Sequence, residues 1–353
     1  MKLEALLGTE LPIIQAPMAS AHGSALVIAA SRAGALGSLP CAMLEPDAMR
    51  AELRAVRMGT QRPVNVNFFC HAPPTRSDAR EAAWREALAP YYREFGIDPA
   101  TVPTGAGRLP FSTESCDVLE EFKPPVVSFQ FGLPSEALLA RVKRTGAKVL
   151  CSATTVDEAR FLESHGVDAI IAQGVEAGGH RGMFLTDDLS TQLPTFALVP
   201  QIVNAVKVPV IAAGGVADAA CVAAARALGA SGVQVGTAFL LCAEATTSKV
   251  HRAAIASEAA AHTALTNLFT GRPARGIVNR IMREIGPMGP APEFPWATSA
   301  IAPLRSRAEA SGSGDFSPLW CGQNTTGCRE APAATIVADL AKGLLSCPMS
   351  SSR

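Results

Sequence analysis

The sequence predicts a (β/α)8 TIM barrel, and three observations lead to this prediction. Eight short apolar segments recur along the chain, and each runs into a polar or glycine-rich loop. The stretches between them have amphipathic helical spacing. The length of 353 residues suits a single α/β barrel core. A doubly wound sheet is the alternative, because a strand count from sequence alone is a soft constraint.

The apolar segments are continuous rather than alternating, which is typical of parallel strands covered by helices. The first four predicted strands are PIIQA, ALGSL, VNVNFF and VVSFQF, at 12–16, 35–39, 64–69 and 126–131. The next four are KVLCSA, DAIIAQ, VPVIAA and GVQVGT, at 148–153, 168–173, 208–213 and 232–237. Segments such as TVDEARFLESHG and DAACVAAARALGA have helical periodicity, and a glycine in each is a suitable C-cap.

Two regions do not fit the plain repeat. Roughly 60 residues separate the third and fourth predicted strands, and SDAREAAWREALAPYYREFG among them has the character of a helix. Residues 245–313 follow the eighth strand and are too long for an ordinary connection. We therefore expect a barrel at 1–244, a lid or cap at 245–313, and a return to the barrel with a C-terminal helix at 314–353.

Charge and cysteine content limit the classes of function. Lys and Arg together number 31, as do Asp and Glu, which argues against a nucleic-acid or polybasic membrane partner. Glu4 and Glu10 interrupt any apolar signal-peptide core, and no apolar run is long enough to span a bilayer. The nine cysteines contain no C-x-x-C pair, so we expect reduced thiols, no metal site and a cytoplasmic protein acting on a small molecule.

Glycines and amides at the strand ends carry the chemistry. The last two predicted strands end in Gly214-Gly215 and Gly236-Thr237, where the loops of such barrels hold a phosphate. Ordinary tight turns would explain either pair alone. No G-x-G-x-x-G, Walker A, G-x-S-x-G or H-E-x-x-H motif occurs. Amide side chains, which can serve both donors and acceptors of a flavin edge, stand near five strand ends, at Gln15, Asn67, Gln130, Gln173 and Gln234.

Several longer stretches resemble the nitronate monooxygenases, FMN-dependent barrel enzymes formerly called 2-nitropropane dioxygenases. The matching stretches cover nearly the whole chain: PIIQAPMA (12–19), NFFCH (67–71), AQGVEAGGHRG (172–182), PVIAAGGV (209–216), GVQVGTAF (232–239), NRIMREIGP (279–287) and SPLWCGQ (317–323). The glycine-rich pieces alone are shared with FMN-dependent quinone reductases and enoyl-ACP reductases. NFFCH, SFQFG and PLWCGQ together favour the nitronate monooxygenases.

The resemblance assigns roles to individual residues. It implies a catalytic role for His180, with Gly178 and Gly179 letting the backbone approach the flavin; the alternative is a turn histidine bonded to a carbonyl. It implies that Gln130, His71 and Gly179 belong to the substrate pocket. The implied FMN contacts are Ala16, Pro17, Met18, Asn67, Gln173, Gly178, Gly214, Gly215, Gln234, Val235, Gly236 and Thr237.

One position departs from the family pattern. Gln130 stands at the centre of SFQFG, where the family commonly has a histidine. Glutamine can bond a nitronate oxygen, but it cannot move a proton near neutral pH. His71 and His22 remain as other imidazoles, although loop roles suit both.

The reaction that the resemblance implies is the FMN-dependent oxidation of an alkyl nitronate, such as propionate 3-nitronate, or of a nitroalkane. Molecular oxygen is the co-substrate, and a carbonyl compound and nitrite are the products. An NAD(P)H-dependent FMN reductase of quinones or enoyl thioesters is the alternative enzyme. A flavin-binding protein without activity is a further alternative, and assembly as a homodimer stays open.

Overall fold

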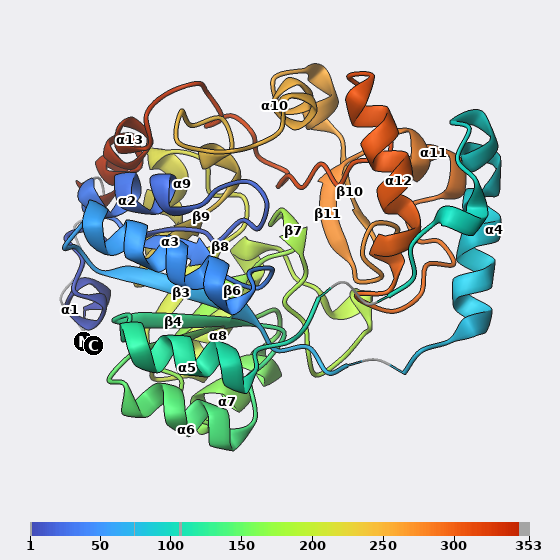
Figure 1. The fold of residues 1–353 in the computed structure, drawn as a ribbon. Coiled ribbons are helices and arrows are strands. Elements are labelled where there is room, and N and C mark those ends of the chain that lie inside the picture. Colours follow the sequence, from blue (N-terminus) through green and yellow to red (C-terminus); the bar gives the residue numbers. More distant parts are fainter. Residues whose placement is uncertain (1, 74, 106–107, 346–353) are drawn as a thin grey trace.

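Eight parallel strands form a closed ring in the computed structural model, which describes residues 2–73, 75–105 and 108–345 (Figure 1). The hydrogen-bonded order is β1 (Ile13–Gln15), β9 (Gly232–Val235), β8 (Val210–Ala213), β6 (Ala169–Gln173), β5 (Lys148–Ala153), β4 (Val126–Gln130), β3 (Val64–Phe69) and β2 (Gly37–Pro40). A parallel bridge between Ile14 and Leu36 closes the ring. The barrel prediction is confirmed, and each predicted apolar segment overlaps one of these strands.

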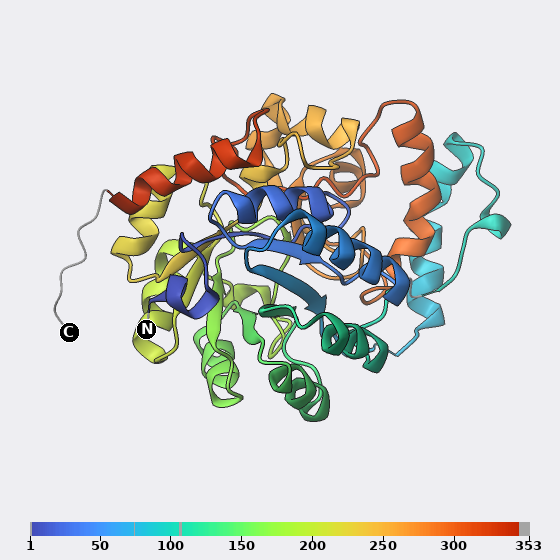
Figure 2. The ribbon, with the colours of Figure 1, turned by 60° about the vertical axis from the view of Figure 1, so that its left-hand side comes forward.

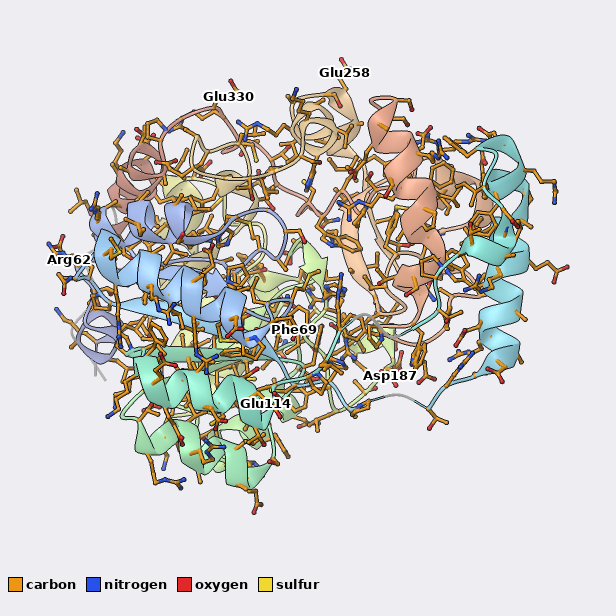
Figure 3. All side chains as sticks on the ribbon, viewed as in Figure 1. Arg62, Phe69, Glu114, Asp187, Glu258 and Glu330 are labelled. Atoms are coloured by element: carbon orange, nitrogen blue, oxygen red, sulfur yellow. The ribbon has the colours of Figure 1, made fainter. Side chains whose placement is uncertain are left out.

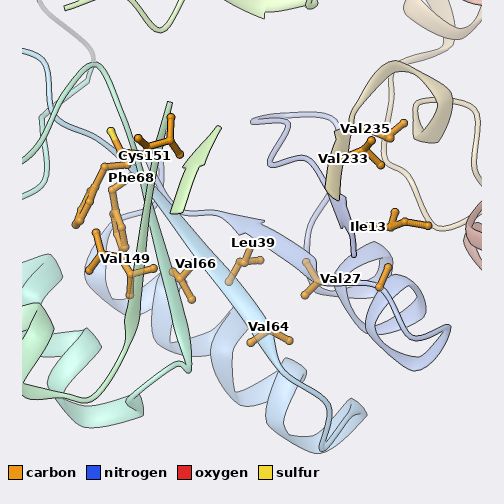
Figure 4. Packing of buried hydrophobic residues seen from close by; sticks show 14 of the residues in the cluster. Ile13, Val27, Leu39, Val64, Val66, Phe68, Val149, Cys151, Val233 and Val235 are labelled. Carbon is orange, nitrogen blue, oxygen red and sulfur yellow. The ribbon is translucent and has the colours of Figure 1, made fainter. Parts of the chain in front are cut away.

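Helices cover the outside of the ring (Figure 2). They are α2 (Ser24–Arg32), α3 (Pro46–Gly59), α5 (Thr113–Phe122), α6 (Glu136–Arg144), α7 (Val156–Ser164), α8 (Thr195–Ala205), α9 (Ala219–Ala227) and α13 (Ala333–Leu345). Their apolar faces and the outward side chains of the strands form the largest buried cluster, in which Val64, Val66 and Phe68 of β3 take part (Figure 4). Burial of such side chains, at about 1.5–3 kcal/mol each, is the main stabilising contribution.

The interior of the barrel is closed at the amino ends of the strands. The short helix α1 (Leu3–Leu7) places Leu3 and Leu7 in a second buried cluster with inward residues such as Ile14 and Leu150. A Cβ on Gly232, the first residue of β9, would lie 2.4 Å from the carbonyl oxygen of Pro12 and 2.5 Å from Leu3 Cδ2, and the backbone contact requires glycine here. The carboxyl ends of the strands therefore remain as the end where a ligand can enter.

The two long excursions pack against each other beside the barrel. The first contributes α4 (Asp78–Glu94) and η1 (Pro99–Thr101). The second contributes β10 (Thr263–Thr266), β11 (Ala274–Ile277), α11 (Arg280–Ile285) and α12 (Ala297–Ala310). We call α4, β10, β11, α11 and α12 the cap. Helices α4 and α12 lie side by side in Figures 1 and 2.

A separate hydrophobic cluster holds the cap together. It includes Trp84 and Tyr92 of α4 and Leu304 of α12. The indole nitrogen of Trp84 donates to the carbonyl of Ala297 at 3.2 Å, and the Tyr92 hydroxyl donates to that of Ala300 at 2.6 Å. The helix expected between the third and fourth strands therefore exists, and it belongs to this cluster.

The connections contain α10 (Lys249–Ile255), η2 (Leu189–Thr191), η3 (Thr237–Phe239) and η4 (Glu258–Ala261). Residues 346–353, which belong to the third segment expected from the sequence, lie outside the described residues. Within the described part of the chain, none of the helices has the length and apolar character needed to cross a membrane.

A second sheet joins the cap to the barrel. The two-residue strand β7 (Gly179–His180) pairs antiparallel with β11, which pairs with β10. His180 lies opposite Ala274, and Gly179 lies opposite Arg275. No periodic pattern in the sequence predicts this strand, which fixes the backbone of the predicted catalytic histidine.

Candidate active site

A large cavity opens at the carboxyl ends of the barrel strands and extends under the cap. Its empty space is about 1610 Å³, a value that includes the open mouth and the adjoining solvent. Phe69 of β3 lines it and lies between the barrel and the cap in Figure 3. Most of the predicted site residues also line it: Ala16, Pro17, Met18, Asn67, Gln130, Gln173, Gly178, Gly179, His180, Gly214, Gly215, Gln234, Gly236 and Thr237.

The loops after β8 and β9 form a cradle of backbone groups. Gly214 and Gly215 have φ values of 109° and 72°, a left-handed conformation that favours glycine. The returning chain reinforces the cradle, because Gly322 N–H donates to Thr237 Oγ1 at 3.0 Å. The amide of Asn324 donates to the Gly215 carbonyl at 2.9 Å. Glycine turns of this kind expose main-chain N–H groups, which suit a phosphate.

Gly178 and Gly179 are glycines for different reasons. A Cβ on Gly178 would lie 2.6 Å from Gly322 N and 2.7 Å from the carbonyl carbon of Cys321. The close approach at Gly178 is therefore to the protein's own backbone. Gly179 has a φ of +73°, and a Cβ there would meet nothing within 4 Å. Both glycines line the cavity.

The amides differ in how well the protein satisfies them. Gln234 Oε1 is buried and has no hydrogen-bond partner among the described residues, so it can accept from a ligand N–H. Asn67 Nδ2 already donates to Ser128 Oγ at 2.9 Å. Gln15 is completely buried, and its Oε1 accepts from Ser38 N–H at 3.1 Å, so this amide is structural. The cradle and the free Gln234 oxygen fit the phosphate and the polar ring edge of a flavin mononucleotide.

His180 is fixed at its backbone and at its ring. Its carbonyl accepts from Gln173 Nε2 at 3.0 Å and from Gln130 Nε2 at 3.2 Å. The ring nitrogen Nε2 lies 3.0 Å from Thr270 Oγ1 of the cap. The ring is therefore bonded to a hydroxyl and faces the cavity, unlike a turn histidine bonded to a carbonyl.

The surroundings of the His180 ring are apolar and basic. Burial lowers the pKa of this imidazole well below its ordinary value, and Arg108, Arg272 and His71 lower it further. The ring is therefore neutral at neutral pH and can act as a base. Four aromatic rings surround it, with centroids 6.0, 5.8, 5.5 and 5.4 Å away, from Phe69, Phe131, Phe294 and Trp320.

Three basic residues of the cavity were not predicted from the sequence: Arg108, His251 and Arg305. Arg108 lies over the Phe294 ring at 5.7 Å, and burial, followed by the charge of Arg305, lowers its pKa to about 10. Arg305 pairs with Glu309 at 2.8 Å. Among the described residues that line the cavity there is no Asp or Glu, so the cavity favours an anion.

Two predicted site residues, Val235 and His71, do not line the cavity, and neither does His22. Val235 packs in the outer core beside Val233 (Figure 4). His71 is buried 4.8 Å from Phe294, centroid to centroid, behind the ring that faces His180. His22 Nε2 accepts from Met18 N–H at 3.1 Å and so holds the loop after β1. No group of three His, Cys, Asp or Glu residues in the described chain could hold a metal ion.

Comparison with known proteins identifies the family. A sequence model of the family described as nitronate monooxygenase matches residues 1–343. The chain belongs to the nitronate monooxygenase family. It is therefore an enzyme, an oxidoreductase that acts on nitronates.

Known members of the family match this chain over almost their whole length. A nitronate monooxygenase of Pseudomonas aeruginosa is 41% identical over 343 residues, which is 96% of this chain and 97% of the relative. One from Paraburkholderia phytofirmans is 41% identical, covering 96% and 93%. A solved nitroalkane oxidase from Streptomyces ansochromogenes has a TM-score of 0.87 and 37% identity, covering 98% and 99%. FabK from Thermotoga maritima has a TM-score of 0.73 and 28% identity, covering 97% and 95%.

Proposed function

We propose that this nitronate monooxygenase binds FMN and uses molecular oxygen to convert alkyl nitronates, such as propionate 3-nitronate, or nitroalkanes into carbonyl compounds and nitrite. One observation carries the proposal. The backbone cradle, the unpaired Gln234 oxygen and the neutral His180 ring all face one cavity, in which the described lining side chains include no carboxylate.

The cavity offers a place for each part of FMN. The backbone at Gly214, Gly215 and Gly236-Thr237 would hold the phosphate, because glycine turns present N–H groups to an anion. Gln234 Oε1 would accept a hydrogen bond from the ring N–H. When bound, the flavin supplies the redox chemistry by accepting electrons from the substrate and passing them to oxygen.

The protein side chains handle charge and protons. A nitronate is an anion, and Arg108 and Arg305 make the cavity attractive to it. A neutral nitroalkane must first lose a proton from its α-carbon, and a neutral His180 can accept that proton. Gln130 lines the same cavity, and its amide nitrogen also supports the His180 carbonyl, so it would orient the base as well as contact substrate.

We also propose that the barrel at 1–244, apart from α4, and the described part of the returning segment, 314–345, act as the fixed part of the site. Residues 245–313 would act as a lid together with α4, because α4 shares the hydrophobic cluster of the cap. A lid of this kind excludes water from the reacting groups.

The test is to identify the cofactor and its reductant. The purified protein is heated, and the released cofactor is separated by chromatography; we expect FMN. The holoenzyme is then mixed anaerobically with propionate 3-nitronate or with NADH, and flavin absorbance is followed. Bleaching by the nitronate, but not by NADH, supports the proposal. FAD or NAD as the main ligand, or bleaching by NADH alone, would refute it, and the latter would favour the quinone or enoyl-thioester reductase.

A further inference from the structure

We propose that Thr270 is a positioning residue for His180: its hydroxyl holds Nε2, so that Nδ1 is the nitrogen that takes the substrate proton. This inference rests on the proposed function, because it names the working atom of the proposed base. Thr270 lies in the cap between β10 and β11, ninety residues from His180 in sequence.

The geometry leaves Thr270 as the ring's hydrogen-bonding partner. Its Oγ1 lies 3.0 Å from His180 Nε2, and the threonine is 2% exposed. The neighbouring Phe69, Phe131 and Phe294 offer only ring faces and edges. In the part of the chain that the structure describes, no other hydrogen bond to a ring nitrogen of His180 is present.

The distance to the ring allows either direction, and we assign Thr270 Oγ1 as the acceptor because a carbonyl is within reach of its own proton. Oγ1 donates to the carbonyl of Arg272 at 3.4 Å and accepts from the N–H of the same residue at 3.4 Å. A hydroxyl has one proton and two lone pairs. With its proton on the Arg272 carbonyl, Oγ1 has a lone pair left for His180 Nε2–H. In a neutral imidazole only one nitrogen carries a proton, so Nδ1 then holds the free lone pair.

This tautomer suits proton removal from a nitroalkane. The α-carbon C–H bond breaks, an N–H bond forms at Nδ1, and the electron pair of the C–H bond moves onto the nitro group to give the nitronate. The resulting imidazolium keeps its Nε2–H bond to Thr270, so the hydroxyl does not have to rotate. The charged or titratable groups around the ring are Arg108, Arg272 and His71, all basic, and the nitronate formed would offset their charge.

The cap therefore contacts both the backbone and the imidazole ring of His180. Strand β11 pairs with β7 and fixes the His180 backbone, with Ala274 opposite it. The loop that precedes β11 supplies Thr270 and fixes the ring. One short segment, 270–274, therefore contacts both the backbone and the ring of His180.

Variants of Thr270 separate proton removal from later steps. Thr270→Val keeps the shape but lacks the hydroxyl, and we expect it to lower kcat/KM for nitroethane by about tenfold or more. Oxidation of preformed ethylnitronate, which needs no base, should change less than about twofold. Thr270→Ser should restore most of the nitroethane rate. Thr266→Val is the matched control, since Thr266 is equally buried but its hydroxyl accepts from Leu268 N–H at 3.2 Å and does not contact His180.

A second readout does not depend on activity. The protein has six histidines, so ¹⁵N-histidine labelling gives a small set of imidazole signals, and His180→Asn assigns the relevant pair. We expect His180 to carry its proton on Nε2 in the wild type and to lose this preference in Thr270→Val. A proton on Nδ1 in the wild type, or equal losses on both substrates in Thr270→Val and Thr270→Ser, would overturn the inference. If the wild type reacts with neither substrate, the proposed function fails, and the ¹⁵N signals still decide the role of Thr270.

Discussion

Replacing Gly178 by alanine tests whether the cradle depends on close backbone packing. The new Cβ would lie 2.6 Å from Gly322 N, whereas ordinary contacts begin near 3.4 Å. The Cys321–Gly322 backbone must therefore retreat by about 0.8 Å. A retreat of this size would stretch the 3.0 Å bond from Gly322 N–H to Thr237 Oγ1 beyond hydrogen-bonding range.

The expected cost follows from these two effects. Overpacking a tight site typically costs about 1–3 kcal/mol, and loss of one hydrogen bond adds about 0.5–1.5 kcal/mol. An unfolding entropy of about 2.1 cal/mol/K per residue gives roughly 0.7 kcal/mol/K for 353 residues. Each kcal/mol therefore lowers Tm by about 1.3 °C. We expect a fall in Tm of about 2–6 °C, together with loss of most of the bound flavin.

The assay is the flavin-to-protein ratio after gel filtration, with Tm measured on the same samples. Gly343→Ala is the matched control, because its Cβ would collide with the Ala219 carbonyl at the α13–α9 contact, away from the cavity. This control should lose Tm but keep its flavin. Equal flavin content in both variants would refute the packing explanation for Gly178.

Three further predictions concern His180, Gln130 and His22. His180→Asn should keep its flavin and lower turnover by about 10²–10⁴-fold, with a larger loss for nitroalkanes than for nitronates. The measurement is the initial rate per bound flavin on both substrates. Unchanged rates would mean that His180 has only a structural role. Gln130→His should add an ionisation to the pH profile of kcat/KM, and burial should place it below about pH 6.5. A profile that superimposes on that of the wild type would show that position 130 does not face the substrate. Burial lowers the pKa of His22 to about 4, so the unfolded chain binds this proton more tightly, and stability is lost as the pH falls from about 6.5 toward 4. His22→Gln should lose less Tm over that pH range than the wild type, and an equal loss would contradict this reading of His22.

The barrel was predictable because its signal is local. Each strand is a short and mainly apolar segment followed by a polar or glycine-rich loop, and in the structure β3, β4, β5 and β6 are almost entirely buried. The glycine pairs and amides at the strand ends were predictable for the same reason, since a parallel barrel brings all carboxyl ends together. Val235 was predicted as a flavin contact together with its sequence neighbours. In the structure, alternation along β9 points its side chain to the outer core.

The rest of the site depends on contacts between distant parts of the sequence. Strand β7 has two residues, too few for a periodic pattern, and its partners in β11 lie more than ninety positions away. Arg108 and Arg305 come from two separate excursions that meet only because the cap has a common hydrophobic cluster. The sequence does not distinguish Thr270 from other loop threonines, because its contact with His180 depends on the pairing of β7 with β11.

The pairing of β7 with β11 has a consequence for protein engineering. A version of the chain cut back to the barrel strands and helices would lose the strand partner and the ring partner of His180 in a single deletion. Chimeras that combine the barrel of one relative with the cap of another have a similar requirement. Their crossover points must keep Ala274 opposite His180, because a shift by one residue would turn the imidazole to the other face of the small sheet. Recombination between relatives is therefore constrained at the 270–274 segment more than at the cap helices.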